Sequence, residues 1–314
     1  MPRTLIHLDT DIGGDIDDLC ALALVLAWPG AELVALTTVS DDGGRRAGYA
    51  RHALALAGRS DVPVAAGADI SLGCYQPTPG FPAREDDYWP EPVPPAPGPH
   101  DAALDLLERS IARGAVVAAV GPFTNLALLE RRAPGRLRDA RLCLMGGHFI
   151  TPREGFPQWD YREDWNVQVD HASALHVFEH SSPTLVPLAA TAETWLTSSQ
   201  LPALRRAPSP LARLIARQAE AFASDERLAE RYAPTCPALP PDFINFQHDP
   251  LACAVAFGWD EGVEVTELPL KYEAGGGFLR QRIEEGGRAT KVVTKADGAR
   301  FGEFWLDAVT GVAG

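Results

Sequence analysis

The feature that most constrains this chain is an acidic segment near its start, residues 9–18, which reads DTDIGGDIDD and contains five aspartates. A mostly apolar run before it predicts a strand, and an apolar helical pattern after it predicts a helix. Carboxylates at this density repel one another unless a cation lies among them. Helix capping would explain Asp17 and Asp18, but it does not explain Asp9 and Asp11 at the end of a buried strand. The segment therefore predicts a metal or catalytic site.

Composition limits the class of protein and its partners. The 314 residues suffice for one large α/β domain with a sizeable core. The formal net charge of −14 argues against a nucleic-acid polymer or an anionic membrane as partner and fits a small neutral or cationic ligand. The five cysteines form no C-x-x-C pair, so reduced thiols are expected. Without a signal-peptide pattern or an apolar stretch of transmembrane length, we expect a cytoplasmic protein.

Strands and helices alternate along the first half of the chain. Strands are expected at 5–8, 32–39, 62–66, 115–120 and 141–145, and helices at 17–27, 45–57, 101–112 and 125–132. Further on, a helix at 249–257, strands near 262–270 and 290–294, and a helix at 302–309 are expected. This order predicts an α/β fold, a single domain over residues 1–314 with a mostly parallel central sheet flanked by helices.

Ligands of such sheets bind beyond the carboxyl ends of the strands. Four polar or glycine-rich strand exits fall there: the acidic segment, 38–42, 121–125 and 145–148. Together they predict a site at one edge of the sheet.

Two further segments are expected to border this site. Residues 76–99 hold nine prolines, and a long loop inside a compact domain is more often a lid or binding loop than an idle one. Its part from Tyr75 to Trp89 is expected to cover the site with aromatic side chains. Residues 202–232 are expected to form a loop and then a helix over 211–232, also beside the site.

Seven short motifs, in order along the chain, resemble those of the calcium-dependent nucleoside hydrolases, the inosine–uridine-preferring N-ribohydrolase family. They are the acidic segment, TTV at 37–39, VPVAAGA at 62–68, GPFTNLA at 121–127, MGG at 145–147, DWNVQVD at 164–170 and HDPLA at 248–252. The resemblance implies hydrolysis of the N-glycosidic bond of a ribonucleoside or related N-riboside to ribose and free base. It also implies a role in purine or pyrimidine salvage and a homodimer or homotetramer.

The resemblance also implies roles for individual residues. Ca²⁺ would be held by Asp11, Asp18, Asp249 and the backbone carbonyl of Thr124, with Asp9 either a ligand or a residue that orients the others. A metal-bound water would be the nucleophile, with Asp11 as general base. His248 would protonate the leaving base, although a histidine before a helix can also be a capping or core residue. The residues implied to contact substrate are Asp17, Asp164, Trp165 and Asn166.

The chain also departs from the family pattern. The acidic segment carries two extra residues between Gly13 and Asp17, which makes Asp15 surplus if Asp17 and Asp18 are the functional pair. An asparagine of the family is replaced by aspartate, and we expect Asp42 to contact substrate and to shift specificity, because an ionised carboxylate can only accept hydrogen bonds. Asp164 is one methylene shorter than the family's glutamate, Trp165 replaces a phenylalanine, and the Pro-rich stretch replaces a His-Gly segment. These changes predict an unusual leaving group or 5′ substituent.

Two alternative functions fit parts of the sequence. A phosphoryl-transfer protein of the haloacid-dehalogenase type also opens with D-x-D after a strand, but it needs Thr or Val where this chain has Gly13. It also needs a lysine after this motif, and the first half of this chain has none, since the first lysine is Lys271. A non-catalytic nucleoside- or sugar-binding protein on the hydrolase fold would lack a general base or a metal ligand, and all these positions are filled. Release of free base from a nucleoside panel, with and without EDTA, separates binding from hydrolysis.

Overall fold

The computed structural model describes residues 3–69 and 88–311, and in its first half strands and helices alternate as predicted. The elements are β1 (Thr4–Thr10), α1 (Asp17–Ala27), β2 (Ala31–Thr38), η1 (Asp42–Gly44), α2 (Arg45–Leu56), β3 (Val64–Ala66), α3 (His100–Ala112), β4 (Val116–Ala119), α4 (Thr124–Arg132) and β5 (Arg141–Met145). Predicted helices and strands lie within about two residues of these bounds, because apolar runs and glycine or proline stops mark both ends of each element.

The second half is less regular. Its elements are η3 (Tyr161–Glu163), α5 (Trp165–Gln168), α6 (His171–His180), β6 (Thr184–Val186), α7 (Leu188–Thr191), β7 (Trp195–Thr197), η4 (Ser198–Gln200), α8 (Leu201–Arg206), α9 (Pro210–Glu226), α10 (Leu228–Tyr232), β8 (Phe243–Phe246), α11 (His248–Phe257), β9 (Val263–Gly275), β10 (Phe278–Ile283), β11 (Arg288–Ala296) and α12 (Gly298–Thr310). The single helix expected over 211–232 is two helices, because Arg227 adopts a left-handed φ of 51° between them.

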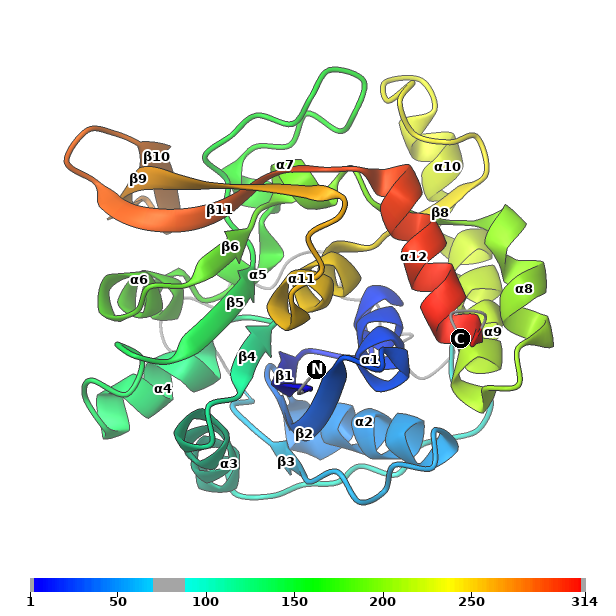
Figure 1. Ribbon diagram of the computed structural model, residues 1–314, viewed down its shortest axis with the longest axis horizontal. Helices are drawn as coiled ribbons and strands as arrows, with labels where there is room; N and C mark the ends of the chain where they lie inside the picture. The colour runs from blue at the N-terminus through cyan, green and yellow to red at the C-terminus, as the bar shows by residue number, and fades with distance from the viewer. Residues whose placement is uncertain (1–2, 70–87, 312–314) are drawn as a thin grey trace.

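The central sheet confirms the predicted α/β class. Within the described residues it has nine strands in the order β10-β9-β11-β6-β5-β4-β1-β2-β3. The strands from β11 to β3 run parallel, whereas β9 and β10 add to the β11 edge in antiparallel fashion. Figure 1 shows this sheet crossing the molecule from β3 to the projecting β9–β10 hairpin.

Helices cover both faces of the parallel strands. In Figure 1, α3, α4 and α6 lie on one side of the sheet, and α1, α2 and α11 lie on the other. Alternation along β5 shows the two cores: Cys143 and Met145 pack with the α1–α11 side, and Leu142 and Leu144 pack with the α3–α6 side. Burial on both faces explains why the strands are apolar throughout rather than alternating with polar residues.

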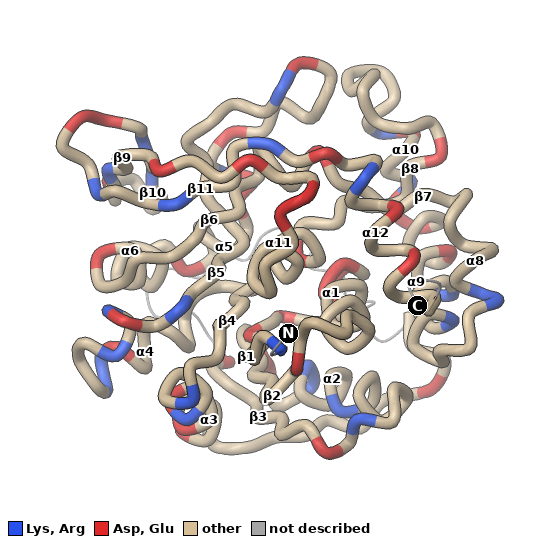
Figure 2. The backbone as a smooth tube through the Cα atoms, viewed as in Figure 1, with Lys and Arg blue, Asp and Glu red and all other residues tan. Residues whose placement is uncertain are grey.

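The antiparallel arm of β9, β10 and β11 is charged rather than apolar. Figure 2 shows basic and acidic residues interspersed along it. Three ion pairs lie on it: Lys271–Glu284, Arg282–Glu273 and Lys295–Glu264. Such charges disfavour pairing of an exposed edge strand with another chain.

Parallel register brings the predicted strand exits to one edge of the sheet. Asp9 of β1 pairs with Thr37 of β2 on one side and with Ala119 of β4 on the other, and Ala119 pairs with Leu144 of β5. The segments that follow these strands therefore emerge side by side. Separately, none of the helices in the described ranges has both the length and the apolar character needed to cross a membrane.

Candidate active site

A cavity of about 420 Å³ opens at this edge of the sheet. The described residues that line it are Asp11, Gly14, Asp15, Asp17, Asp18, Arg46, Tyr88, Val120, Met145, Glu163, Asp164, Trp165, Asn166, Leu188, Phe222, Glu226, His248 and Asp249. Eight of the residues singled out from the sequence thus share one cavity, and they come from the β1 exit and from the starts of α1, α5 and α11.

The carboxylates at the start of α1 form a tight group. Oxygen atoms of Asp15, Asp17 and Asp18 lie within 4.8 Å of one another, and Asp11 and Asp249 line the same cavity. Burial raises the pKa of Asp17, Asp18 and Asp249 well above the ordinary range, and the neighbouring negative charges raise these pKa values further. An all-oxygen donor set under such repulsion fits a hard divalent cation. Asp15, which was considered surplus, belongs to this group.

Asp11 is oriented by contacts from two sides. The indole Nε1 of Trp165 donates to its Oδ2 at 3.1 Å, and the Arg46 guanidinium donates to its backbone carbonyl oxygen. Burial raises the pKa of Asp11, while the charge of Arg46 and the Trp165 hydrogen bond counteract this rise. Trp165 therefore contacts the proposed base directly. The sequence predicted only that Trp165 contacts substrate, so this contact is an additional one.

Asp9 and Thr124 are both buried, and their side chains hydrogen-bond within the protein rather than into the cavity. Asp9 is fully buried, and its Oδ1 accepts hydrogen bonds from Thr37 Oγ1 at 2.5 Å and from Asn125 Nδ2 at 2.8 Å. The Thr124 hydroxyl donates to Asp170 at 2.6 Å at the first turn of α4. Neither residue is among those that line the cavity.

His248 begins α11 and meets the cavity with its imidazole ring. Its Nδ1 lies 2.7 Å from Thr191 Oγ1, so Nε2 is the ring nitrogen that is not engaged by this contact. The ring is packed against Phe246 and Trp159, at centroid distances of 5.2 Å and 5.8 Å. Burial lowers the pKa of His248 to about 4, so the ring is neutral near pH 7.

Asp164 and Asn166 are held by backbone groups at the β5 and β4 exits. Asp164 caps α5, and its carboxylate accepts from Gly147 N at 2.5 Å and from Val167 N at 3.3 Å. Burial raises the pKa of Asp164 to about 6. Asn166 donates through Nδ2 to Val120 O at 2.7 Å and to the carbonyl oxygen of Met145, so its amide oxygen is the acceptor that remains.

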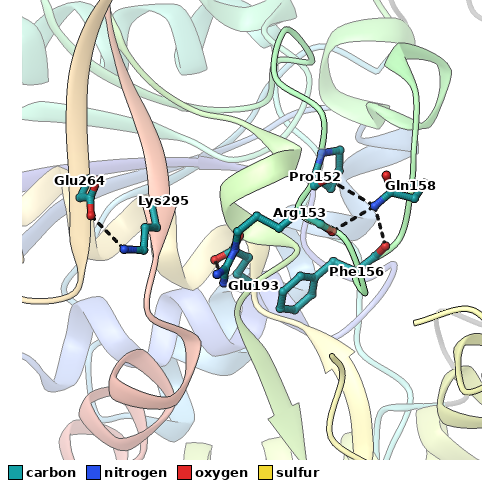
Figure 3. Close-up of polar contacts among 7 residues, drawn as sticks. All are labelled: Pro152, Arg153, Phe156, Gln158, Glu193, Glu264 and Lys295. Atoms are coloured by element: carbon teal, nitrogen blue, oxygen red, sulfur yellow. Dashed lines mark hydrogen bonds and ion pairs between the residues drawn. The ribbon is translucent and has the colours of Figure 1, made fainter. Parts of the chain in front are cut away.

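The loop between β5 and η3 brings Trp159 to His248. Figure 3 shows Arg153 of this loop reaching Glu193, which follows α7. The two side chains form a bidentate ion pair with N–O distances of 2.5 and 2.6 Å, and Glu193 is buried. Gln158 donates to three carbonyl oxygens of the same loop, including that of Phe156 at 2.9 Å. These contacts fix the loop immediately before Trp159.

The structure places Asp42 outside the cavity, contrary to the expectation that it contacts substrate. Asp42 is solvent-exposed in η1 and does not line the cavity. Its neighbour Asp41 is buried instead and accepts hydrogen bonds from Thr38 Oγ1, Arg46 N and Ala47 N. The inward carboxylate of this turn therefore anchors the start of α2, and the next residue points to solvent.

Other walls come from segments of which only part is described. Residues 70–87 lie outside the described residues, so most of the expected Tyr75–Trp89 cover is not placed. Trp89 stacks on Tyr49 of α2 with ring centroids 4.7 Å apart, and Tyr88 lines the cavity. The ring of Phe222 in α9 lies 6.1 Å from that of Tyr88, which places part of 202–232 at the cavity.

Sequence reasoning missed several lining residues. Arg46, Phe222, Glu226 and Leu188 carry no motif of their own, and their participation depends on how α2, α7 and α9 pack. For Glu163 the sequence holds a local signal, because the pattern at 164–170 marks Asp164 as a helix N-cap just beyond a strand exit. Glu163 lies immediately before it.

Comparisons with known proteins identify the family of this chain. Residues 6–303 match the family described as inosine-uridine preferring nucleoside hydrolase. The pyrimidine-specific ribonucleoside hydrolase RihA of Shewanella sp. (strain MR-4) is 30% identical over 242 residues, which cover 71% of this chain and 70% of that protein.

Solved structures show the same fold. The plant nucleoside hydrolase PpNRh1 superposes with a TM-score of 0.81 at 22% identity, covering 98% of this chain and 99% of that one. The purine-preferring ribonucleoside hydrolase from Gardnerella vaginalis gives a TM-score of 0.76 at 21% identity, covering 99% of both chains. With nearly the whole length matched, the chain belongs to the inosine–uridine-preferring nucleoside hydrolase family.

Proposed function

We propose that this N-glycosyl hydrolase cleaves the bond between ribose and base in a ribonucleoside or a related N-riboside, with Asp11 as general base. The observation that carries the proposal is the meeting of the acidic group, Asn166 and His248 in one cavity. The net reaction adds the oxygen of water to the sugar and one proton of that water to the departing nitrogen. The sugar becomes positively charged along this path, and surrounding carboxylates favour that charge.

Asp11 is suited to take the proton from the attacking water. Its carboxylate lies in the cavity, and the hydrogen bond from Trp165 to Oδ2 fixes its orientation. A carboxylate whose pKa is raised by burial is a stronger base than an exposed one. Proximity and fixed orientation then replace a random encounter with water.

We further propose Ca²⁺ as the cofactor, held by Asp11, Asp18, Asp249 and the backbone carbonyl of Thr124. Asp15 joins this region as an additional carboxylate. When bound, the ion would make a water ligand more acidic and would coordinate sugar hydroxyls. The supporting observation is the mutual repulsion of buried carboxylates, which a divalent cation relieves.

The other polar residues would bind the substrate and its leaving group. Asp17 and the amide oxygen of Asn166 accept hydrogen bonds from ribose hydroxyls, and Asp164 lies toward the 5′ end. The Thr191 hydroxyl hydrogen has two acceptors within reach, the Leu188 carbonyl oxygen at 3.4 Å and Nδ1 of His248 at 2.7 Å. When it points to Nδ1, the ring proton lies on Nε2, and His248 donates through Nε2 to the departing base. The hydrogen bond stabilises negative charge that develops on the base as the glycosidic bond breaks.

A nucleoside panel tests the proposal. Free base should be released from at least one purine or pyrimidine nucleoside, and EDTA should abolish the release while added calcium restores it. Asp11→Asn should lower kcat by a factor on the order of 10² or more, as removal of an acid–base group does. The calcium content of this variant is measured beside its rate. A variant with full calcium and full rate contradicts the assignment, and a wild type that binds nucleosides without cleaving them is a binding protein.

The resemblance also supports a homodimer or homotetramer as part of this proposal. Size-exclusion chromatography with light scattering tests it, and a monomeric mass at working concentrations contradicts it.

A further inference from the structure

Arg46 occupies an unusual place for a basic residue. It is 2% exposed, and it is the one Lys or Arg among the described residues that line the cavity. Its guanidinium donates to the carbonyl oxygens of Asp11 and Ile12, the second at 3.1 Å, and to that of Ser40 at 2.8 Å. One side chain of α2 therefore ties the loop after β1 to the turn after β2.

The position of Arg46 is itself fixed. Its backbone N–H donates to Asp41 Oδ1 at 2.8 Å, and Ala47 N donates to the other oxygen of the same carboxylate at 3.0 Å. Thr38 of β2 holds this carboxylate as well, at 2.6 Å. The Ser40 carbonyl belongs to a residue with a left-handed φ of 51°, so the turn is shaped to this arrangement. The guanidinium thus acts from a rigid base.

The loop that Arg46 contacts needs such a support. Residues 11–18 carry four of the aspartates in the cavity, and two of the residues between Gly13 and Asp17 are extra relative to the family motif. A longer loop has more conformations to lose, and like charges on it repel one another. Hydrogen bonds to the carbonyl oxygens of residues 11 and 12 restrict the start of the loop, at its first aspartate, Asp11.

Charge alone would act in the opposite direction. A positive guanidinium near a cation site repels the cation, so its removal should by itself tighten cation binding. Loss of a support for the loop should weaken cation binding, because residues that orient metal ligands typically contribute a factor of about 10 to 100 in affinity. The sign of the change therefore distinguishes a positioning role from a purely electrostatic one.

We propose that Arg46 is a positioning residue that holds the Asp11–Asp18 loop in its cation-binding arrangement through three backbone carbonyl oxygens. This inference rests on the proposed calcium site and concerns a residue outside the motifs that define it. Because Arg46 acts through the loop, its loss affects cation binding first and hydrolysis only as a consequence.

The test measures calcium binding in the full-length protein after removal of metal with EDTA. Calorimetric titration with Ca²⁺ is compared for wild type, Arg46→Gln and Arg46→Lys. Arg45→Gln is the matched control, because Arg45 is the exposed neighbour in the same helical turn. We expect Arg46→Gln and Arg46→Lys to weaken calcium binding about tenfold or more, and Arg45→Gln to change it less than about twofold. Base release by Arg46→Gln should recover as calcium is raised.

Circular dichroism verifies folding before each titration. An Arg46→Gln variant that binds calcium as tightly as wild type, or more tightly, overturns the inference. If that variant does not fold, Arg46→Lys decides, because it keeps the charge and loses the forked geometry; unchanged affinity there also overturns it. A wild type that binds no calcium overturns it together with the proposed cofactor. A wild type that binds calcium but releases no base overturns only the proposed hydrolysis.

Discussion

His7 gives the sharpest prediction about stability, because it is a fully buried histidine with both ring nitrogens engaged beneath the active site. Nδ1 lies 2.8 Å from Ser110 Oγ, and Nε2 lies 2.9 Å from Thr37 Oγ1. The Thr37 hydroxyl donates to Asp9, so it accepts from Nε2, and Nδ1 accepts from Ser110. Burial lowers the pKa of His7 from 6.5 to about 3, and the folded protein therefore keeps the ring neutral.

His7 makes the protein less stable in acid, because the unfolded state binds a proton at this histidine more readily than the folded state does. Below pH 6.5 the unfolded chain takes up a proton at this histidine, whereas the folded protein does not until the pH approaches 3. The contribution of the neutral ring to stability is therefore present above pH 6.5 and is lost as the pH falls. Each pH unit in this window removes about 1.4 kcal/mol, so lowering the pH from 6.5 to 5 should remove about 2 kcal/mol.

The measurement compares wild type with His7→Gln, whose amide can still accept from Ser110 and donate to Thr37. Urea unfolding in EDTA gives the free energy of unfolding of each protein at pH 7 and pH 5. The buried carboxylates act in the opposite direction, because their raised pKa values let the folded state bind protons first as the pH falls. They are present in both proteins, so the difference between the two pH dependences isolates His7.

We expect wild type to lose about 2 kcal/mol more than His7→Gln between pH 7 and pH 5. The exposed His100 supplies the control, and His100→Gln should follow the wild-type profile. If the profiles of wild type and His7→Gln run parallel, the folded protein accommodates a charged ring at this position, and the reasoning from burial is refuted.

Two predictions concern the proposed catalytic groups. Trp165→Phe removes a hydrogen bond that lowers the pKa of Asp11. The acidic limb of the pH profile of kcat/KM should therefore move to higher pH. An acidic limb at the wild-type position would contradict the role of this hydrogen bond. Thr191→Val removes the partner of His248 Nδ1. It should lower kcat about tenfold or more for ordinary nucleosides and leave hydrolysis of 4-nitrophenyl riboside nearly unchanged, because that leaving group needs no proton; equal losses on both substrates would contradict the role of His248.

The first half of the fold could be predicted from the sequence because its signals are local. Apolar runs of strand length alternate with helical patterns, and glycine or proline ends each one, so β5 was placed at 141–145 as observed. The break at Arg227 has no such signal, because a left-handed φ is uncommon for any residue other than glycine. Strand β10 was missed although its signal is local: it forms a tight hairpin with β9, in which Phe278 pairs with Gly275 across Gly276 and Gly277, both with positive φ, and a Gly-Gly pair between two strand-like runs is typical of such a turn.

Some residues of the site could also be predicted from the sequence, and others could not. Residues that follow directly from a strand exit or a helix start, such as Asp11, Asp18 and Asp249, were found because topology fixes where those points meet. Arg46 could not be found, because a long side chain reaches a cavity that its own helix does not form. The exposure of Asp42 could not be predicted either, since one residue of register in a tight turn decides which carboxylate points inward, and here it is that of Asp41.

The contacts of Asp9 account for an aspartate in the acidic segment that does not face the cavity. Its Oδ1 joins Thr37 of β2 to Asn125 of α4, and Asn125 in turn donates to the Thr38 carbonyl oxygen at 2.8 Å. Through Thr37 the same network reaches His7. Neighbouring strand exits are thus fastened to one another by buried polar groups, whose geometry is more demanding than that of apolar contacts. Since Asp11 follows two residues after Asp9, this network also sets where the proposed base leaves the strand.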